Sequence, residues 1–160
     1  TGGGIVINGK PLKGVQNIAG EWGHNPLGNE QRHCYCGRDD CVETYLSGPG
    51  LVKTWQQAGG TGNVAALEIA NMASQGEALA LDALEHYTRH FARALANVIN
   101  ILDPEVVVLG GGLSNIASLY AELPGALEKH IFSDTMYTRI VKNHHGDSSG
   151  VRGAAWLWEA

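Results

Sequence analysis

The chain has 160 residues, a length typical of a single domain. Its 16 acidic residues outnumber 11 lysines and arginines, and the resulting net charge of −5 argues against a chain that mainly neutralises nucleic-acid phosphates. Charged residues make up only 17% of the chain, so the composition is not that of a disordered protein.

The N-terminal part of the chain predicts short elements around a long loop. Residues 5–10 form a β-branched stretch that runs into an Asn8-Gly9 turn, which is a strong hairpin signal. Residues 11–33 lack periodicity and carry Gly, Pro, Asn and His, so they predict a functional loop. Three short helices separated by glycine-containing breaks are expected after it, at residues 42–46, 51–57 and 64–72.

The C-terminal part predicts an α/β unit. Residues 78–102 carry apolar side chains at spacings of three and four, as one face of an amphipathic helix does, and Asp103-Pro104 ends this helix. The apolar run 106–109 predicts a strand buried on both faces. Ser114 or Asn115 is placed to cap a helix reaching about residue 130, and further elements are expected at 138–141 (strand) and 150–159 (helix). The order strand, glycine turn, helix, strand favours an α/β fold.

The three cysteines and one histidine have the spacing of a metal site, His24-x9-Cys34-x-Cys36-x4-Cys41. Three thiolates and an imidazole are the Cys3His ligand set of structural zinc, and Gly37 can supply the turn that brings Cys41 back. The alternative is three free cysteines close together by chance and an ordinary polar histidine. A zinc ion with four protein ligands would order the loop 24–41, whose own apolar content is low.

Two carboxylates flank this metal loop. Glu21 lies three residues before His24, and Glu43 lies two residues after Cys41. Fixing both ends of the loop at one metal brings them together, and carboxylate oxygens accept hydrogen bonds from hydroxyls. Glu21, His24 and Glu43 therefore predict a site for a polyhydroxylated substrate. The alternative is that Glu43 only interacts with a helix dipole and that Glu21 is simply solvated.

Two glycine clusters are candidates for nucleotide contact. Gly110, Gly111 and Gly112 follow an apolar strand and precede a helix, where backbone N–H groups can approach a nucleotide; the alternative is a plain strand-to-helix turn. Gly2, Gly3 and Gly4, before the first strand, are a second candidate phosphate cradle. The sequence contains neither a P-loop signature nor the G-x-G-x-x-G of dinucleotide-binding folds.

The chain has no apolar run of roughly 18 residues, so no membrane association is expected. Clustered thiols without partners elsewhere favour a reducing compartment, most simply the cytoplasm. Because the chain begins with Thr1 and three glycines rather than with methionine, we expect it to be a fragment that starts inside a glycine-rich loop.

Five motifs stand in one order along the chain: GEWGH at 20–24, CYCGRDDCVE at 34–43, NILDP at 100–104, VVLGGG at 107–112 and HGDSSGVRGAA at 145–155. Together they resemble the ROK family of sugar kinases and repressors, and the resemblance covers essentially the whole chain. The cysteine motif is the most specific of them. One departure lies within it, because the family usually has glycine where Asp40 stands.

The resemblance implies an α/β lobe of the actin-like ATPase (ribonuclease H-like) fold with a structural zinc loop. Residues 1–160 would be the C-terminal lobe of a two-lobe kinase, whose other lobe carries the first phosphate loop and the general-base aspartate. It implies no catalytic residue in this chain and three sets of ligand contacts: Zn2+ at His24, Cys34, Cys36 and Cys41; a hexose at Glu21, His24 and Glu43; and ATP with Mg2+ at Gly2, Gly3, Gly4, Gly110, Gly111 and Gly112.

The activity implied by the resemblance is ATP-dependent phosphorylation of a hexose hydroxyl by the whole protein, as a homodimer, with the isolated chain inactive. The wording of residues 23–27 and 154–158 favours a fructokinase acting on fructose or mannose. The alternatives are a glucokinase or N-acetylglucosamine kinase of the same family, and a sugar-responsive repressor. Only the repressor would bind nucleic acid, through a helix-turn-helix upstream. A zinc module without any ligand is a further alternative.

Overall fold

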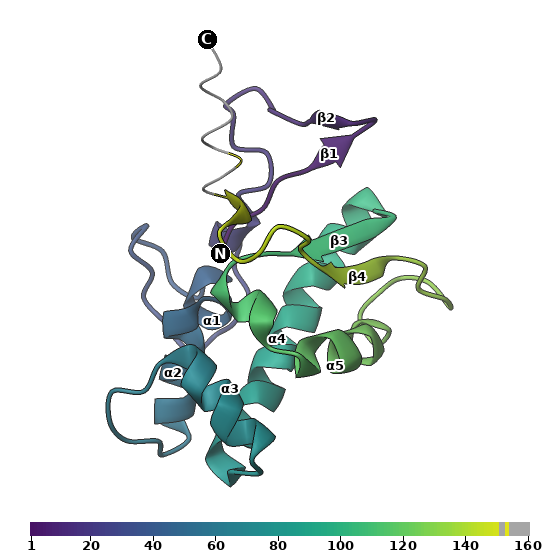
Figure 1. Cartoon of the computed structure of the whole chain (residues 1–160). Coiled ribbons are helices and arrows are strands. Elements are labelled where there is room, and N and C mark those ends of the chain that lie inside the picture. The colour runs from purple at the N-terminus through teal and green to yellow at the C-terminus, as the bar shows by residue number, and fades with distance from the viewer. Residues whose placement is uncertain (151–152, 154–160) are drawn as a thin grey trace.

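A computed structural model describes residues 1–150 and Gly153, so the helix predicted at 150–159 falls almost wholly outside the described residues. The elements, of which η1 and η2 are 3₁₀ helices, are shown in Figure 1. In chain order they are β1 (Val6–Ile7), β2 (Lys10–Pro11), η1 (Trp22–His24), α1 (Glu43–Leu46), α2 (Gly48–Gln57), α3 (Ala66–Ser74), α4 (Ala78–Leu102), β3 (Val106–Leu109), η2 (Gly112–Asn115), α5 (Ser118–Leu127) and β4 (Arg139–Lys142).

Helix α4 is the centre of the molecule, and its bounds agree with the predicted 78–102. The Glu77 carboxylate caps its start by accepting from the Ala80 N–H at 2.6 Å. Asp103 ends it in the left-handed conformation, with φ +43. Leu84, Phe91 and other members of the predicted face are buried. Leu81 and Leu102, in the first and last turns of α4 and predicted for the same face, are exposed.

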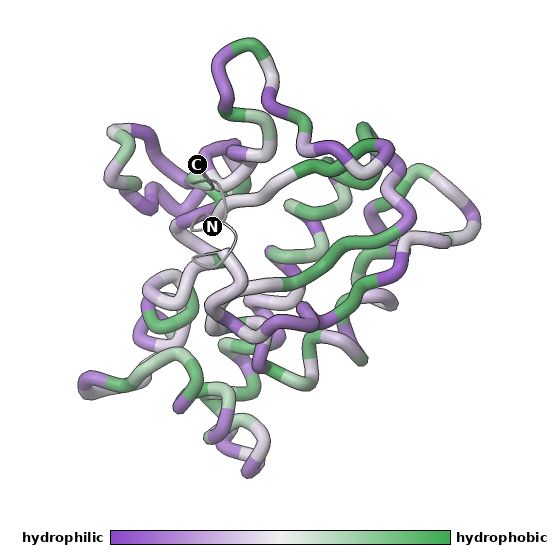
Figure 2. Tube along the Cα trace, turned by 45° about the horizontal axis from the view of Figure 1, so that its top comes forward, coloured by the Kyte–Doolittle hydropathy of each residue, from purple (hydrophilic) through white to green (hydrophobic). Residues whose placement is uncertain are grey.

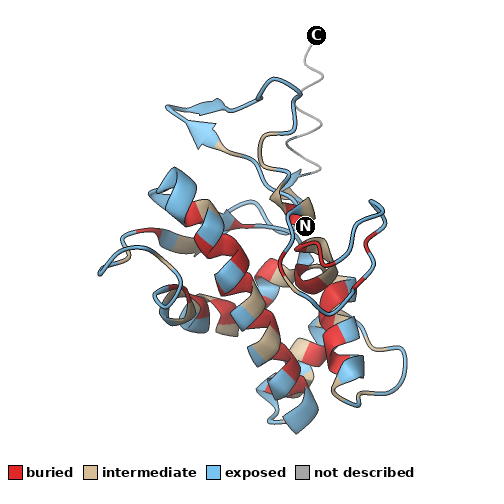
Figure 3. Ribbon diagram, turned by 180° about the vertical axis from the view of Figure 1, so that it is seen from behind, coloured by how far each residue is buried: buried red, intermediate tan, exposed pale blue. Residues whose placement is uncertain are grey.

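The core forms where α1, α2, α3 and α5 pack against α4. Figure 3 shows the buried residues concentrated along α4 and on the inner sides of these helices. Tyr45, Leu51, Ile69, Leu119 and Leu123 are among the large side chains that are fully buried. No helix of the described residues combines the length and the apolar character that crossing a bilayer requires.

Strands β3 and β4 are parallel and joined through α5, which confirms the predicted strand–turn–helix–strand unit. The prediction that 106–109 is buried on both faces is wrong in this structure. Val107 and Leu109 pack against the core, whereas Val106 and Val108 are 39% and 57% exposed. The cause is that, among the described residues, this sheet has two strands and the helices cover one of its faces.

The predicted hairpin is present as β1 and β2, and its turn residues Asn8 and Gly9 have φ values of +51 and +74, as a type I′ turn requires. Figure 1 shows the hairpin projecting away from the helices. Val6 and Ile7 are more than half exposed, and Figure 2 shows the apolar stretches of β1 and β3. The hairpin therefore contributes no side chain to the buried core of the described residues.

Two helix starts differ from the predictions. Helix α2 begins at Gly48 instead of residue 51, because the Ser47 hydroxyl caps it by accepting from the Gly50 N–H at 3.1 Å and a first helical turn tolerates Pro49. Helix α5 begins at Ser118 without a side-chain cap, so the expected capping by Ser114 or Asn115 is wrong. Those two residues are the last two of η2, and the Ser114 hydroxyl donates to the carbonyl of Gly111, the residue before η2, at 2.7 Å.

Candidate metal and sugar site

The structure brings the four predicted metal ligands together. The ligand atoms of His24, Cys34, Cys36 and Cys41 all lie within 4.8 Å of one another. The Sγ atoms of Cys36 and Cys41 are 3.6 Å apart, and Cys34 Sγ is 3.7 Å from His24 Nδ1. Tetrahedral zinc with Zn–S bonds of about 2.3 Å separates its sulfurs by roughly 3.8 Å. The donor set and its spacing therefore fit zinc.

Local backbone geometry builds this arrangement from a short stretch of sequence. Helix η1 ends with His24, while an antiparallel bridge pairs Pro26 with Cys41. Gly37 has φ +85, and its N–H donates to the Cys34 carbonyl at 2.9 Å, which turns the chain back between the cysteines. The turn predicted at Gly37 is thus confirmed, and its positive φ explains why glycine stands there.

The three thiols have different electrostatic surroundings. Cys36 lies at the surface, and a hydrogen bond from the Arg38 backbone is the main cause that lowers the pKa of its thiol. Cys41 is buried, and burial raises the pKa of its thiol. Of these two thiols, Cys36 is therefore the one that loses its proton more readily, and metals bind thiolates.

Asp40, immediately before Cys41, is buried and accepts four hydrogen bonds. Its carboxylate receives the backbone N–H groups of Glu30, Gln31 and Arg32 at 3.0 to 3.1 Å. The Tyr45 hydroxyl donates to it at 2.5 Å, and this bond is the main cause that lowers the pKa of Asp40. Asp40 has φ +56, so it adopts a backbone conformation that glycine usually supplies.

Arg32 is the second buried polar residue of the loop, with 2% of its surface exposed. Its guanidinium donates to four oxygens and stacks on the Tyr45 ring at 4.2 Å from the centroid. The acceptors are Glu30 Oε2 at 2.8 Å, the Thr44 carbonyl at 3.1 Å, Thr54 Oγ1 at 3.1 Å and Gln57 Oε1 at 2.6 Å. The loop is therefore tied to α1 and α2 by a network that contains no metal ligand.

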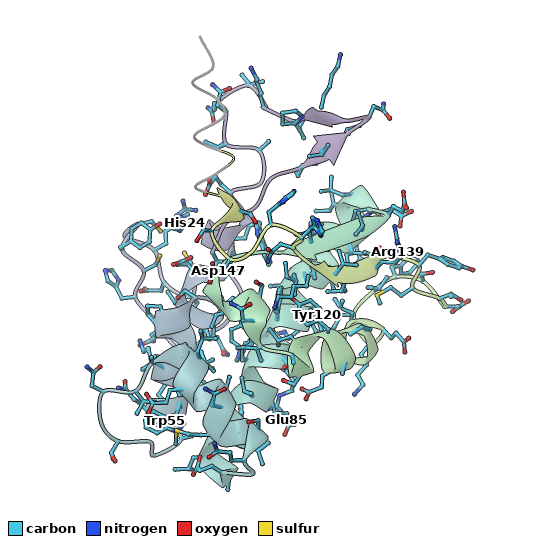
Figure 4. All side chains as sticks on the ribbon, in the orientation of Figure 1. His24, Trp55, Glu85, Tyr120, Arg139 and Asp147 are labelled. Atoms are coloured by element: carbon cyan, nitrogen blue, oxygen red, sulfur yellow. The ribbon has the colours of Figure 1, made fainter. Side chains whose placement is uncertain are left out.

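The predicted sugar contacts differ in their surroundings. His24 is half-buried (labelled in Figure 4), and Glu43 is the first residue of α1, where its carboxylate pairs with the amino group of Thr1. Glu43 therefore also fits the alternative interpretation, in which it lies in the first turn of a helix. Glu21 is exposed and precedes η1.

Tyr35 is a residue of this site that the sequence reasoning did not single out. Its hydroxyl lies 3.0 Å from His24 Nε2, and the two rings meet edge to face at 5.2 Å. Burial and the charges of Glu43, the neighbouring thiols and Glu21 raise the pKa of Tyr35. The contact with His24 places Tyr35 beside one of the predicted sugar contacts. Its place between two cysteines was the only available signal.

The two glycine clusters lie in different surroundings. A Cβ atom on Gly110, Gly111 or Gly112 would meet nothing within 4 Å, so this turn after β3 is open. The N-terminal glycines instead lie against the start of the metal loop. Gly3 passes so close to Gly20 that a Cβ on Gly20 would be 2.3 Å from the Gly3 carbonyl oxygen.

A cleft of about 740 Å³ lies between α3, α4 and the start of α5, next to η2. Its lining includes Leu67, Leu81, Asn115 and Ser118. The exposed Leu81, predicted to lie on the apolar face of α4, is thus part of a cavity wall. The sequence alone did not indicate this cleft, because its walls come from three separate helices.

The fold and the site together define the class of protein to which the chain belongs: an α/β unit that bears a Cys3His loop. The family profile of the ROK family matches residues 1–160, and the chain belongs to that family. Its fold is the actin-like ATPase fold of the ROK sugar kinases, as predicted.

Three similar proteins illustrate the relationship. An N-acetyl-D-glucosamine kinase of Photobacterium profundum is 42% identical, over 98% of this chain and 54% of that protein. The structure of a ROK family glucokinase from Streptomyces griseus, in complex with glucose and AMPPNP, has a TM-score of 0.87 at 26% identity, over 98% of this chain and 56% of its own.

A ROK family transcriptional regulator, described as a homologue of an Escherichia coli protein, has a TM-score of 0.75 at 26% identity. It is matched over 87% of this chain and 38% of its own. The chain spans about half the length of the curated relatives it matches.

Proposed function

We propose that residues 1–160 form the C-terminal lobe of an ATP-dependent ROK hexose kinase. The observation that carries the proposal is the Cys3His cluster before α1. Its His24 contacts Tyr35, and its Cys41 lies two residues before Glu43, the first residue of α1. Carboxylate, imidazole and hydroxyl groups in one place suit a substrate with many hydroxyls. The names of the Photobacterium and Streptomyces relatives, both sugar kinases, agree with this assignment.

Zinc at His24, Cys34, Cys36 and Cys41 would be structural, because the protein supplies all four ligands and leaves no open position. When bound, it would join η1 to the segment before α1. The hexose would then contact Glu21, His24 and Glu43 through its hydroxyls.

ATP, with Mg2+, would meet the chain at its glycine turns. The open Gly110–Gly112 turn can admit a nucleotide against its backbone, and the cleft beside η2 has the volume of a small-molecule site. Gly2, Gly3 and Gly4 would approach the phosphates from the sugar side. Phosphoryl transfer depends mainly on positioning and charge stabilisation, so these contacts are the chain's contribution to catalysis. The general-base aspartate would come from the other lobe.

The sugar that we favour is N-acetylglucosamine, because the 42% identical relative bears that name. Glucose is supported by the Streptomyces glucokinase. Fructose, favoured by the wording of residues 23–27, is the third candidate. We further propose that the kinase is a cytoplasmic homodimer.

The test uses the whole protein from which the chain comes, assayed for ADP release with N-acetylglucosamine, glucose, fructose and mannose. We expect sugar-dependent turnover by the whole protein and none by residues 1–160 alone. Glu43→Gln should raise the KM for the sugar by about 10- to 100-fold, the loss of one charge-assisted hydrogen bond. A whole protein without sugar-dependent turnover would overturn the proposal.

A sugar-responsive repressor is the second candidate, because the ROK transcriptional regulator shares this fold with a TM-score of 0.75. Its binding to DNA would require a segment outside this chain, whose own net charge is −5. Sugar-dependent release of the whole protein from DNA, without ADP formation, would favour this candidate over the kinase.

A further inference from the structure

The segment that holds the metal ligands contains a carboxylate that belongs to none of the ligand sets. Asp40 is 8% exposed and lies next to Cys41. Its four hydrogen bonds come from two sides: three from backbone N–H groups of residues 30–32, and one from the Tyr45 hydroxyl on α1. Such a carboxylate acts on a loop as a capping residue acts on a helix end, by satisfying several free N–H groups at once.

These bonds connect the parts of the chain that carry the site. Residues 30–32 are separated from Cys34 by His33 alone, and Asp40 directly precedes Cys41. Tyr45 belongs to α1, whose first residue is Glu43. One side chain therefore fixes the position of the Cys34 arm relative to both Cys41 and Glu43.

Tyr45 is itself held firmly, so it is a rigid partner for Asp40. The Arg32 guanidinium stacks on one part of its ring, and the His90 ring lies 4.6 Å away, centroid to centroid. A Cβ on Gly28 would be 1.9 Å from the Tyr45 hydroxyl oxygen, so glycine is required there for the hydroxyl to reach Asp40. None of these contacts involves a metal ligand.

We propose that Asp40 is a positioning residue that assembles the metal loop before the metal binds, holding Cys34, Cys41 and Glu43 at their sites in the metal-free chain. The inference rests on the proposed metal centre and goes beyond it, because it assigns part of the metal affinity to a group that does not touch the metal. It also limits the role of zinc, which then completes a loop that is already folded at its base.

The test compares Asp40→Gly, Asp40→Asn and Asp39→Asn in the 160-residue chain. Glycine accepts the positive φ of position 40 but offers no acceptor, and asparagine keeps one acceptor oxygen. Asp39 is the matched control: it is an exposed carboxylate one residue away, bonded to His33 at 3.1 Å. Hydrogen exchange of α4 amides verifies that each variant remains folded, and where Asp40→Gly unfolds, Asp40→Asn decides.

In the metal-stripped chain, the amides of residues 30–32 should be protected in the wild type and in Asp39→Asn. Asp40→Gly should exchange them at least about tenfold faster, with Asp40→Asn in between. Zinc affinity, measured by competition with a chelator, should fall about tenfold or more in Asp40→Gly and change less than about twofold in Asp39→Asn.

Two results would overturn the inference, and they differ from failure of the metal centre. Wild-type and Asp40→Gly chains with equal zinc affinity, or equally fast exchange of the amides of 30–32 when metal-free, would remove the positioning role alone. A wild-type chain that binds no zinc would overturn the metal centre, and the positioning role would fall with it.

Discussion

The metal loop and the glycine turns are both candidate ligand sites, but their physical states are opposite. The loop from His24 to Cys41 has two buried cysteines and a buried Asp40, and Arg32 beneath it has five polar or stacking partners. The Gly110–Gly112 turn is open. A Cβ added to any of its glycines would have no atom within 4 Å other than those of the glycine itself and its two neighbours in the chain. The first region builds a site from its own residues, whereas the second offers backbone to a ligand.

The difference shows how each kind of site is encoded. Thiolate, imidazole and carboxylate groups specify a particular geometry, so the residues around them must hold it. A glycine turn specifies only access, so few contacts surround it. Mutations in the metal loop should therefore change folding and metal binding, and mutations in the glycine turn should change mainly nucleotide binding.

The largest expected effect is loss of the metal. Cys41→Ser replaces a buried thiolate ligand with a hydroxyl, and zinc content should fall from about one ion per chain to none. Metal analysis of the purified chain measures this, and a chelator should have the same effect on the wild type. Hydrogen exchange of the α4 amides should stay slow in both cases, because α4 is held by the apolar core. Three freely reacting thiols in the untreated wild type would contradict the prediction.

Arg32→Met should lower the free energy of unfolding by about 2–4 kcal/mol. The change preserves apolar volume but removes hydrogen bonds to Thr44, Thr54 and Gln57, and a buried acceptor left without a donor costs about 1–3 kcal/mol. Urea denaturation measures the change. Arg38→Met, on the exposed side of the same loop, is the control and should differ from wild type by less than about 0.5 kcal/mol.

Tyr35→Phe should weaken zinc binding by about tenfold without changing the fold. The hydroxyl is the partner of His24 Nε2, and fixing that nitrogen leaves Nδ1 directed toward the thiolates. Chelator competition measures the affinity. Tyr137→Phe, at a tyrosine that is 85% exposed and outside the loop, should leave it unchanged. Equal affinities for the two variants would refute a role of the Tyr35 hydroxyl.

Gly111→Ala and Gly110→Ala separate conformational from ligand effects in the open turn. Gly111 has φ +77 and ψ 179, a backbone region open essentially to glycine alone, so alanine there should destabilise the chain by about 1–3 kcal/mol. Gly110 has no positive φ and free space around it, so Gly110→Ala should leave thermal stability nearly unchanged. In the whole protein, Gly110→Ala should still weaken ATP binding, because its methyl group occupies space that the nucleotide needs. Unchanged ATP affinity would remove this turn from the nucleotide site.

The smallest expected effect is a pH dependence that originates under the metal loop. Burial is the main cause that lowers the pKa of His90, which lies between Tyr45 and Glu30. The unfolded chain therefore binds a proton more readily than the folded chain, so the contribution of His90 to stability is present above its ordinary pKa of about 6.5 and is lost as pH falls below it. Denaturation between pH 5 and 8 (roughly the histidine range) measures the free energy of unfolding. The increase of this free energy with pH that His90 causes should be present in the wild type and absent from His90→Asn.

Much of the fold was predictable because the responsible interactions are local. The spacing of apolar residues defined α4, and Asn8-Gly9 defined the hairpin turn, since each pattern is imposed by backbone geometry over a few residues. The clustering of His24, Cys34, Cys36 and Cys41 was predictable for the same reason, because a metal site demands thiolate and imidazole at short spacing. The exposure of Val106 and Val108 was not predictable, because it depends on what covers the strand.

By itself, the sequence determined the grouping of His24 with the three cysteines, the long helix and the α/β order, all of which follow from residue type and spacing. Only the tertiary structure decided that the metal loop has a second anchor. Asp40 reaches Glu30, Gln31 and Arg32 across a turn, and Arg32 reaches Thr54 and Gln57 on another helix. Such contacts join residues that no periodicity relates, and they form because buried polar groups must find partners wherever the fold brings them.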